Sequence, residues 1–122
     1  MIKNVKIAVV EDNNLIRDFV VDTLMFSVNR EVISFENALS AWDYFDKNDN
    51  SDIIISDVEM PGMDGLELLD RVKNKSPKKI FIVMSANPSY EKRAKELGAD
   101  AFLSKPFSIE DLFSLVELHI AG

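Results

Sequence analysis

The chain has 122 residues, 47% of them hydrophobic, which suits one domain with one core and leaves no room for a second. Its 14 basic and 21 acidic residues give a formal net charge of −7, the wrong sign for a protein that binds nucleic acid phosphates directly. The absence of cysteine excludes disulfides and thiolate metal sites.

The first apolar run of the sequence is short. Lys3 and Lys6 precede the apolar run Ile7 to Val10, which is far too short for a signal peptide or a membrane span. We therefore expect a cytoplasmic protein that does not insert into a membrane, with one domain over residues 1–122.

Short apolar runs alternate along the whole chain with longer stretches of helical spacing. The predicted strands are Lys6–Val10, Glu31–Phe35, Ile53–Ser56, Ile80–Met84 and Ala101–Leu103. Three of these runs are continuously apolar, which is typical of parallel strands covered on both faces.

Helices are predicted between and after the strands, from apolar spacing and end signals. They are a helix through Leu24 capped by Asn13 or Asn14, Ala38–Phe45 capped by Asn37, about Gly65–Lys75, about Ser89–Leu97 ending at Gly98, and one from Ser108 with a Ser108/Asp111 capping box. The aromatic residues Phe19, Phe26, Phe107 and Phe113 are expected in the core. Five strands alternating with five helices predict a doubly wound α/β sandwich.

Polar residues that could form a ligand site follow the predicted strands. In an open parallel sheet the ligand site lies outside the carboxyl ends of the strands, which share one edge. The residues expected there are Glu11 and Asp12 after the first strand, Asp57 and Glu59 after the third, Ser85 after the fourth and Lys105 after the fifth. The carboxylates of Glu11, Asp12 and Asp57 are therefore expected in one cleft with a hydroxyl and an ammonium, and Glu59 flanks them.

These residue types suit phosphoryl transfer. Crowded carboxylates repel one another, and a hard divalent cation such as Mg²⁺ or Mn²⁺ relieves the repulsion. A carboxylate such as Asp57 can attack phosphorus to form an aspartyl-phosphate when the growing charge on the transferred oxygens is neutralised. Lys105 can contact those oxygens as a point charge and Ser85 as a hydrogen-bond donor.

Four segments together resemble the receiver domains of two-component response regulators, including the chemotaxis type, over nearly the full length. They are Val9-Val10-Glu11-Asp12, the stretch from Ser56 to Gly65, Met84-Ser85-Ala86 and the stretch from Phe102 to Phe107. The resemblance implies a flavodoxin-like fold with strand order 2-1-3-4-5. It also implies that Asp57 is the phosphoacceptor, that Glu11 and Asp12 form the acidic pair, and that Asp12, Asp57 and the backbone carbonyl of Glu59 hold the metal.

The same resemblance assigns the remaining site residues. Ser85 and Lys105 match the family's phosphate contacts, and Phe102 occupies its aromatic switch position, with Ser85 as the other switch residue. A cis peptide bond is implied at Lys105-Pro106, since X-Pro bonds adopt cis at low cost. Glu59 and Asn87 flank the site and are candidates for tuning hydrolysis.

The family implies a phosphorylation-activated switch rather than an enzyme acting on a metabolite. The phosphoryl donor would be a histidine kinase or a phosphotransfer protein, and the output a downstream protein target, with a homodimer possible. Ser85 and Lys105 are 20 positions apart, shorter than the family pattern, so the region of the fourth helix should be shortened. This region belongs to the face that carries partner binding or dimerisation in many members.

Two alternatives belong to other functional classes. The first is a receiver-fold interaction module that works without phosphorylation, which the shortened fourth-helix region leaves open. The second is a flavodoxin-like cofactor binder, which needs a phosphate-cradling loop after the first strand. Glu11-Asp12-Asn13-Asn14 has no glycine and the wrong charge for that task, so this alternative ranks last.

Overall fold

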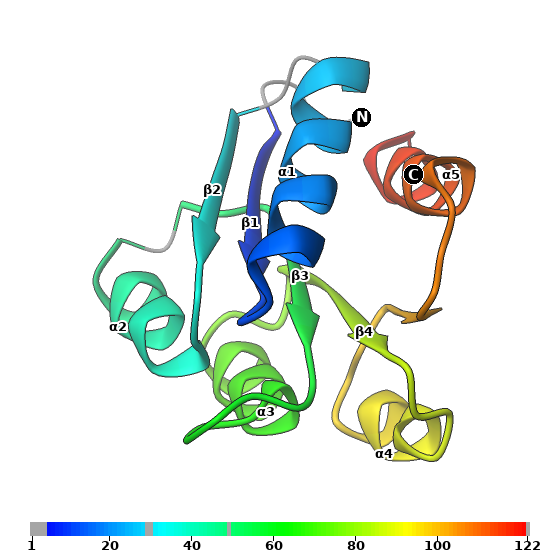
Figure 1. Ribbon diagram of the computed structural model, residues 1–122. Coiled ribbons are helices and arrows are strands. Elements are labelled where there is room, and N and C mark those ends of the chain that lie inside the picture. The colour runs from blue at the N-terminus through cyan, green and yellow to red at the C-terminus, as the bar shows by residue number, and fades with distance from the viewer. Residues whose placement is uncertain (1–4, 29–30, 49, 122) are drawn as a thin grey trace.

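The computed structural model describes residues 5–28, 31–48 and 50–121, which form a parallel sheet of five strands in the order β2-β1-β3-β4-β5 (Figure 1). The strands are β1 (Lys6–Val10), β2 (Glu31–Phe35), β3 (Ile53–Asp57), β4 (Ile80–Ser85) and β5 (Ala101–Ser104). The predicted doubly wound fold and its strand order are confirmed. β3 to β5 each run one residue further than predicted, into the site residues or their neighbours.

Five helices cover the two faces of the sheet. They are α1 (Asn14–Val28), α2 (Ala38–Asn48), α3 (Gly65–Lys75), α4 (Tyr90–Glu96) and α5 (Ile109–Ala121). α1 and α5 pack on one face, and α2, α3 and α4 on the other (Figure 1).

The central strands bury both faces, which explains their continuous apolar sequences. In β1, Ile7 and Val9 enter the core beneath α1 and α5, whereas Ala8 and Val10 enter the core beneath α2, α3 and α4. β3 and β4 alternate in the same way between the two cores. The layers therefore follow from side chains that point alternately to opposite faces.

The predicted helix ends are confirmed by their hydrogen bonds. The Oδ1 of Asn13 accepts from the Ile16 amide at 3.0 Å, and the Oδ1 of Asn37 accepts from the Ser40 amide at 2.8 Å. Gly98 has the left-handed φ of 102° expected after α4. At the start of α5 the amide of Asp111 donates to the Ser108 Oγ at 3.0 Å, and the Ser108 amide donates back to the Asp111 carboxylate at 3.1 Å.

Three helices differ from their predicted lengths. α1 continues past Leu24 to Val28. α2 continues past Phe45 to Asn48, because Lys75 of α3 bonds both the carboxylate of Asp46, at 2.6 Å, and its backbone carbonyl, at 2.5 Å. α4 has only seven residues, with Ser89 and Leu97 as its flanking caps. This short helix lies in the region that was expected to be shortened, and the difference from the family pattern stays a prediction.

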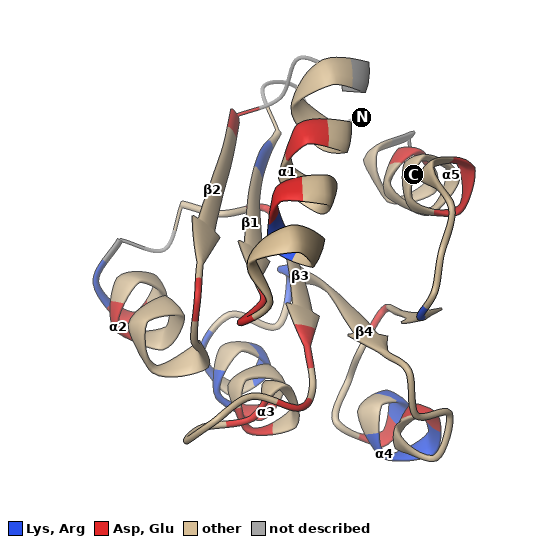
Figure 2. Cartoon of the chain, in the orientation of Figure 1, with Lys and Arg blue, Asp and Glu red and all other residues tan. Residues whose placement is uncertain are grey.

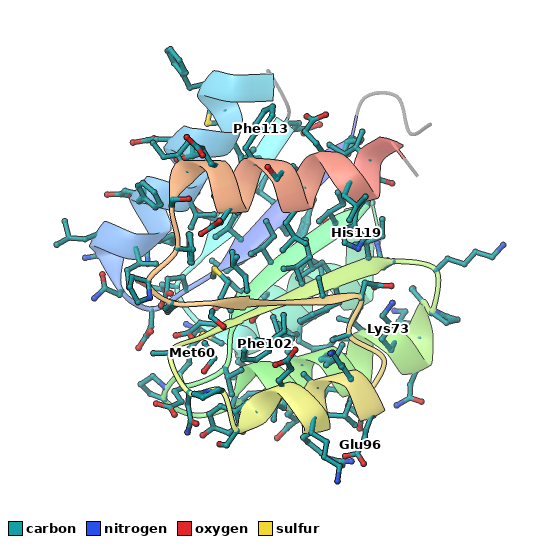
Figure 3. All side chains as sticks on the ribbon, turned by 90° about the vertical axis from the view of Figure 1, so that its right-hand side faces the viewer. Met60, Lys73, Glu96, Phe102, Phe113 and His119 are labelled. Carbon is teal, nitrogen blue, oxygen red and sulfur yellow. The ribbon has the colours of Figure 1, made fainter. Side chains whose placement is uncertain are left out.

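Lys73 fastens α3 to the part of the sheet beside α4 (Figure 3). Its ammonium donates to the Asp100 carboxylate at 2.8 Å and to the Lys79 carbonyl at 2.5 Å. The same carboxylate accepts from the amide of Phe81 in β4 at 2.8 Å. One cation thus joins a helix, a strand and the turn that leads into β5.

Two aromatic residues expected in the core are on the surface. Phe19 is 38% exposed and Phe26 is 95% exposed, both on α1, while Phe107 and Phe113 are half-buried. The expectation was wrong for Phe19 and Phe26, because apolar periodicity shows which residues can face a core without showing how far that core extends.

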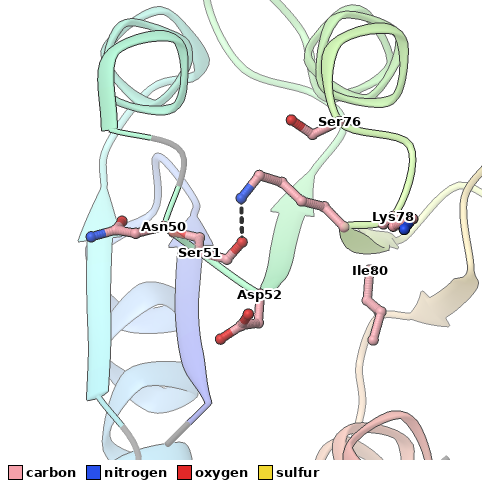
Figure 4. Close-up of a pocket in the computed structure, with 7 residues that line it drawn as sticks. Asn50, Ser51, Asp52, Ser76, Lys78 and Ile80 are labelled. Atoms are coloured by element: carbon pink, nitrogen blue, oxygen red, sulfur yellow. Dashed lines mark hydrogen bonds between the residues drawn. The ribbon is translucent and has the colours of Figure 1, made fainter. Parts of the chain in front are cut away.

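A polar hollow of about 280 Å³ lies at the amino ends of the strands, at the edge of the sheet away from Asp57. Lys79 extends across it and donates to the backbone carbonyl of Ser51 (Figure 4). Within the described part of the chain, no helix has the length and apolar character needed to cross a membrane.

Candidate functional site

Three carboxylates meet at the carboxyl ends of β1 and β3, as predicted. Glu11, Asp12 and Asp57 each offer an oxygen within 4.8 Å of the others, a grouping that can hold a metal ion. Glu11 is fully buried and Asp57 is 7% exposed, whereas Asp12 lies on the surface. In Figure 2 acidic residues mark the ends of these strands, while the basic residues of α4 lie further along the edge. The donors are hard oxygens, which fits a divalent cation of the Mg²⁺ type.

Lys105 supplies the positive charge of the site from the end of β5. Its Nζ lies 2.6 Å from the Oε1 of Glu11 and 3.2 Å from the Oδ1 of Asp57. Burial by itself lowers the pKa of Lys105, but its hydrogen bond to Glu11 and the charges of Asp57 and Glu11 outweigh this, so the pKa is raised. Lys105 therefore remains an ammonium at neutral pH.

Asp12 is held in an unfavourable electrostatic position. Its pKa is raised, first by burial and then by hydrogen bonding to Glu11 and repulsion from its charge, with Lys105 acting in the opposite direction. A cation between Asp12 and Glu11 would remove the cause of this repulsion.

The loop after β3 sets the orientation of Asp57. The amide of Val58 donates to the Asp57 Oδ1 at 2.9 Å, and the amide of Gly65 donates to the Val58 carbonyl at 2.9 Å. A Cβ on Gly65 would lie 1.9 Å from the backbone oxygen of Asp57, so only glycine fits at this position. Asp64 caps α3 by accepting from the Glu67 amide at 2.8 Å.

The residues assigned to the switch lie on β4 and β5. Ser85 is 3% exposed, and its Oγ accepts from the Asn87 amide at 3.0 Å. Phe102 is half-buried and packs against the core on the side of α4 (Figure 3). The Lys105-Pro106 bond is cis, as expected.

The side chain of Glu59 points away from the carboxylate group. It shares a cavity of about 450 Å³ with Tyr90, whose pKa is raised chiefly by a hydrogen bond to Glu59 and by the Glu59 charge. If Glu59 binds a metal, it can do so through its backbone carbonyl but not through its carboxylate as it stands.

Sequence reasoning missed Arg17. Its guanidinium donates to the Glu11 carbonyl at 2.8 Å and to the Asn14 side chain at 2.5 Å, which joins the first turn of α1 to the acidic loop. The signal was available, because a residue one turn after Asn13 lies above the start of the helix.

An apolar groove of about 400 Å³ adjoins the site between α1 and the segment after β5. Its lining consists of Ile16, Phe19, Ala86, Lys105, Pro106 and Phe107. The rings of Phe19 and Phe107 lie 6.0 Å apart in it. Leu15, next to Ile16 on α1, is 82% exposed.

The family model of the response regulator receiver domain matches residues 7–117, and the chain therefore belongs to this family. Proteins of this family are the signalling switches of two-component systems.

Individual relatives agree with this assignment. The chain is 33% identical to the transcriptional regulator NtrC of Escherichia coli over 115 residues, 93% of this chain and 24% of that protein. It is 32% identical to the response regulator FleR of Pseudomonas aeruginosa over 119 residues, 96% of this chain and 25% of that protein. The chain thus spans about a quarter of the length of these curated relatives.

Solved structures of other proteins have the same fold as this chain. The chemotaxis protein CheY4 of Vibrio cholerae superposes with a TM-score of 0.85 at 29% identity, covering 95% of this chain and 98% of that one. TrrA of Thermotoga maritima, whose structure is in complex with Mg²⁺–BeF, superposes with a TM-score of 0.85 at 29% identity, covering 93% of this chain and 97% of that one.

Proposed function

We propose that this chain is a phosphorylation-activated switch in which Asp57 accepts a phosphoryl group from a histidine kinase or phosphotransfer protein. The observation that carries the proposal is the meeting of Asp57, Glu11 and Asp12 with the ammonium of Lys105 at one sheet edge. An oxygen of Asp57 forms a bond to phosphorus while the bond from phosphorus to the donor breaks, and its electron pair leaves with the donor. The family membership and the Mg²⁺–BeF complex of TrrA support this chemistry.

A divalent cation, Mg²⁺ or Mn²⁺, completes the site, held by Asp12, Asp57 and the Glu59 carbonyl, with Glu11 beside it. When bound, the cation offsets the carboxylate charges and the charge on the transferred oxygens. Lys105 is charged and close to Asp57, so it can leave Glu11 to contact a phosphoryl oxygen.

Ser85 and Phe102 transmit the effect of Asp57 phosphorylation to the protein surface. Ser85 lies at the end of β4, where its hydroxyl can donate to a phosphoryl oxygen. Movement of Ser85 would open space for Phe102 to turn inward from the face of α4, β5 and α5. That face would then contact a downstream protein or a second copy of the chain.

The apolar groove beside Lys105 suits the phosphoryl donor. It is lined by Ile16, Phe19 and Phe107, and Leu15 adds an exposed apolar residue on the same helix. A donor must bring its phosphohistidine within bonding distance of Asp57, so its contact surface must lie next to the cleft. An exposed apolar surface in this place favours a donor protein that binds through apolar packing over one that binds through charges alone.

We also propose that residues 1–122 form one receiver domain, which acts in the cytoplasm without direct contact to nucleic acid. It catalyses its own phosphorylation and dephosphorylation and converts no metabolite.

The decisive experiment measures intact mass after incubation with acetyl phosphate. We expect the native chain to gain one phosphoryl group when Mg²⁺ is present and none when the metal is chelated, and Asp57→Asn to gain none in either case. Asparagine keeps the shape of the side chain but is no nucleophile at phosphorus. An unmodified native chain would favour the phosphorylation-independent interaction module, whereas equal modification of Asp57→Asn would show that Asp57 is not the phosphoacceptor.

Replacing Glu59 with alanine should lengthen the lifetime of the phosphorylated form roughly threefold. The Glu59 carboxylate, which faces Tyr90, would have to turn toward Asp57 to orient the attacking water, and an exposed group supplies only a small part of a general-base effect. The decay of the adduct mass after removal of acetyl phosphate measures the lifetime. Glu67→Ala, which removes the same charge from the exposed side of α3, serves as the control, and an unchanged lifetime in Glu59→Ala would contradict the prediction.

Metal affinity should fall as the pH is lowered. The metal binds the ionised form of Asp12, and because the pKa of this carboxyl is raised above its ordinary value of 3.8, protonation begins to compete at a higher pH than for a free aspartate. Calorimetric titration with Mg²⁺ between about pH 7 and about pH 5 tests this, with circular dichroism to confirm that the chain stays folded. A dissociation constant independent of pH across this range would contradict it.

A further inference from the structure

Ser56 is a buried polar residue that the proposed chemistry does not use. It is fully inaccessible to solvent and follows Ile54 on the face of β3 that points toward α2 and α3. An apolar side chain would suit such a place, since a buried hydroxyl is costly unless it is hydrogen-bonded. The Ser56 hydroxyl is therefore expected to make a hydrogen bond that offsets its burial.

The hydroxyl of Ser56 donates to the backbone carbonyl of Asp57, at 2.9 Å and buried. Gly65 approaches the same carbonyl so closely that even one added carbon atom would lie 1.9 Å from its oxygen. The carbonyl of Asp57 is thus fixed by a hydrogen bond and by close packing.

The other end of this peptide group controls the Asp57 side chain. The peptide is planar, so the direction of its carbonyl fixes the direction of the Val58 N–H. That N–H donates to the Asp57 Oδ1 at 2.9 Å, and Lys105 contacts the same oxygen at 3.2 Å. With Oδ1 occupied in this way, Oδ2 is the oxygen that we assign to the attack on phosphorus.

We infer that Ser56 is a positioning residue for phosphoryl uptake, which holds the Asp57–Val58 peptide so that the carboxylate keeps its reactive orientation. The inference rests on the proposed function of Asp57. Ser56 touches neither the phosphoryl group nor the metal. Because Asp57 is also a proposed metal ligand, loss of the Ser56 hydroxyl should slow the transfer by a larger factor than it weakens metal affinity.

The matched pair Ser56→Thr and Ser56→Val tests this, because the two side chains have the same shape and differ by one hydroxyl. The rate constant of phosphorylation by acetyl phosphate at saturating Mg²⁺ should be close to native in Ser56→Thr and about tenfold lower in Ser56→Val. The Mg²⁺ dissociation constant of Ser56→Val should exceed that of Ser56→Thr by a much smaller factor than the difference in rate. Ser56→Ala, which only removes an atom, gives a second comparison if the added methyl group prevents folding.

The outcomes separate this inference from the proposed function. If the native chain takes up no phosphoryl group, the function of Asp57 itself is wrong. If the native chain is modified and Ser56→Val or Ser56→Ala reacts as fast as Ser56→Thr, the positioning role is wrong. A slower rate accompanied by an equal loss of Mg²⁺ affinity would also overturn it, since the hydroxyl would then act on the metal site.

Discussion

Gly65→Ala is expected to destabilise the protein by about 3 kcal/mol and to abolish phosphoryl uptake. The new Cβ would lie 1.9 Å from the Asp57 oxygen and 2.8 Å from its carbonyl carbon, both backbone atoms that no rotamer change can move. Helix propensity alone predicts the opposite sign, because alanine is favoured over glycine within a helix by about 1 kcal/mol. Urea denaturation and the acetyl phosphate assay measure the two effects.

Gly62→Ala is the matched control in the same loop. Gly62 has a φ of 80°, but a Cβ there would meet no atom within 4 Å, so only the backbone conformation opposes the change. We expect a loss of about 1 kcal/mol with phosphoryl uptake retained. Equal stability of Gly65→Ala and the native chain would show that the loop can relax, and the close approach would then not restrain Asp57.

Asp12→Asn should change metal binding and stability in opposite directions. The Mg²⁺ dissociation constant should rise at least about tenfold, because a charged ligand becomes neutral. Without metal, the variant should be more stable than the native chain, because the cost of burying the Asp12 charge and its repulsion by Glu11 are removed. Since Asp12 is exposed and screened by solvent, the gain should be only about 0.5 kcal/mol, a rise in Tm of about 2 °C.

Calorimetry gives the dissociation constant, and thermal melting with and without Mg²⁺ gives the stability. Asp22→Asn changes the net charge by the same amount, on the exposed side of α1 away from the cleft. It should alter neither the Mg²⁺ dissociation constant nor the stability. A lower Tm for Asp12→Asn in the absence of metal would mean that Asp12 is not in conflict with its neighbours.

The order of the strands and helices was predictable from the sequence, and so was the location of the site at the carboxyl ends of the strands. Continuous apolar runs predict strands buried on both faces, and parallel strands bring their carboxyl ends together. Glu11, Asp57 and Lys105 therefore meet as expected, although they lie far apart along the chain. Capping residues such as Asn37 and Ser108 also act over three residues, a range that sequence patterns describe well.

Features that depend on tertiary contacts were not predictable. The last turn of α2 has no apolar spacing and depends on Lys75 from a different helix. The exposure of Phe26 depends on how far α5 covers α1, which no local pattern specifies. The direction of Glu59 depends on its hydrogen bond to Tyr90, the first residue of α4, which no local pattern around Glu59 specifies.

The position of Lys105 directly after the edge strand has a consequence for local unfolding. Among the strands that the structure describes, β1 and β3 each have two neighbouring strands, whereas β5 has β4 as its single neighbour. An edge strand can open at lower free energy than the central strands. Opening of β5 would withdraw the ammonium while the carboxylates stayed in place. A phosphoryl group on Asp57 that is in contact with Lys105 would oppose this opening by mass action. Phosphorylation should therefore slow amide hydrogen exchange in β5.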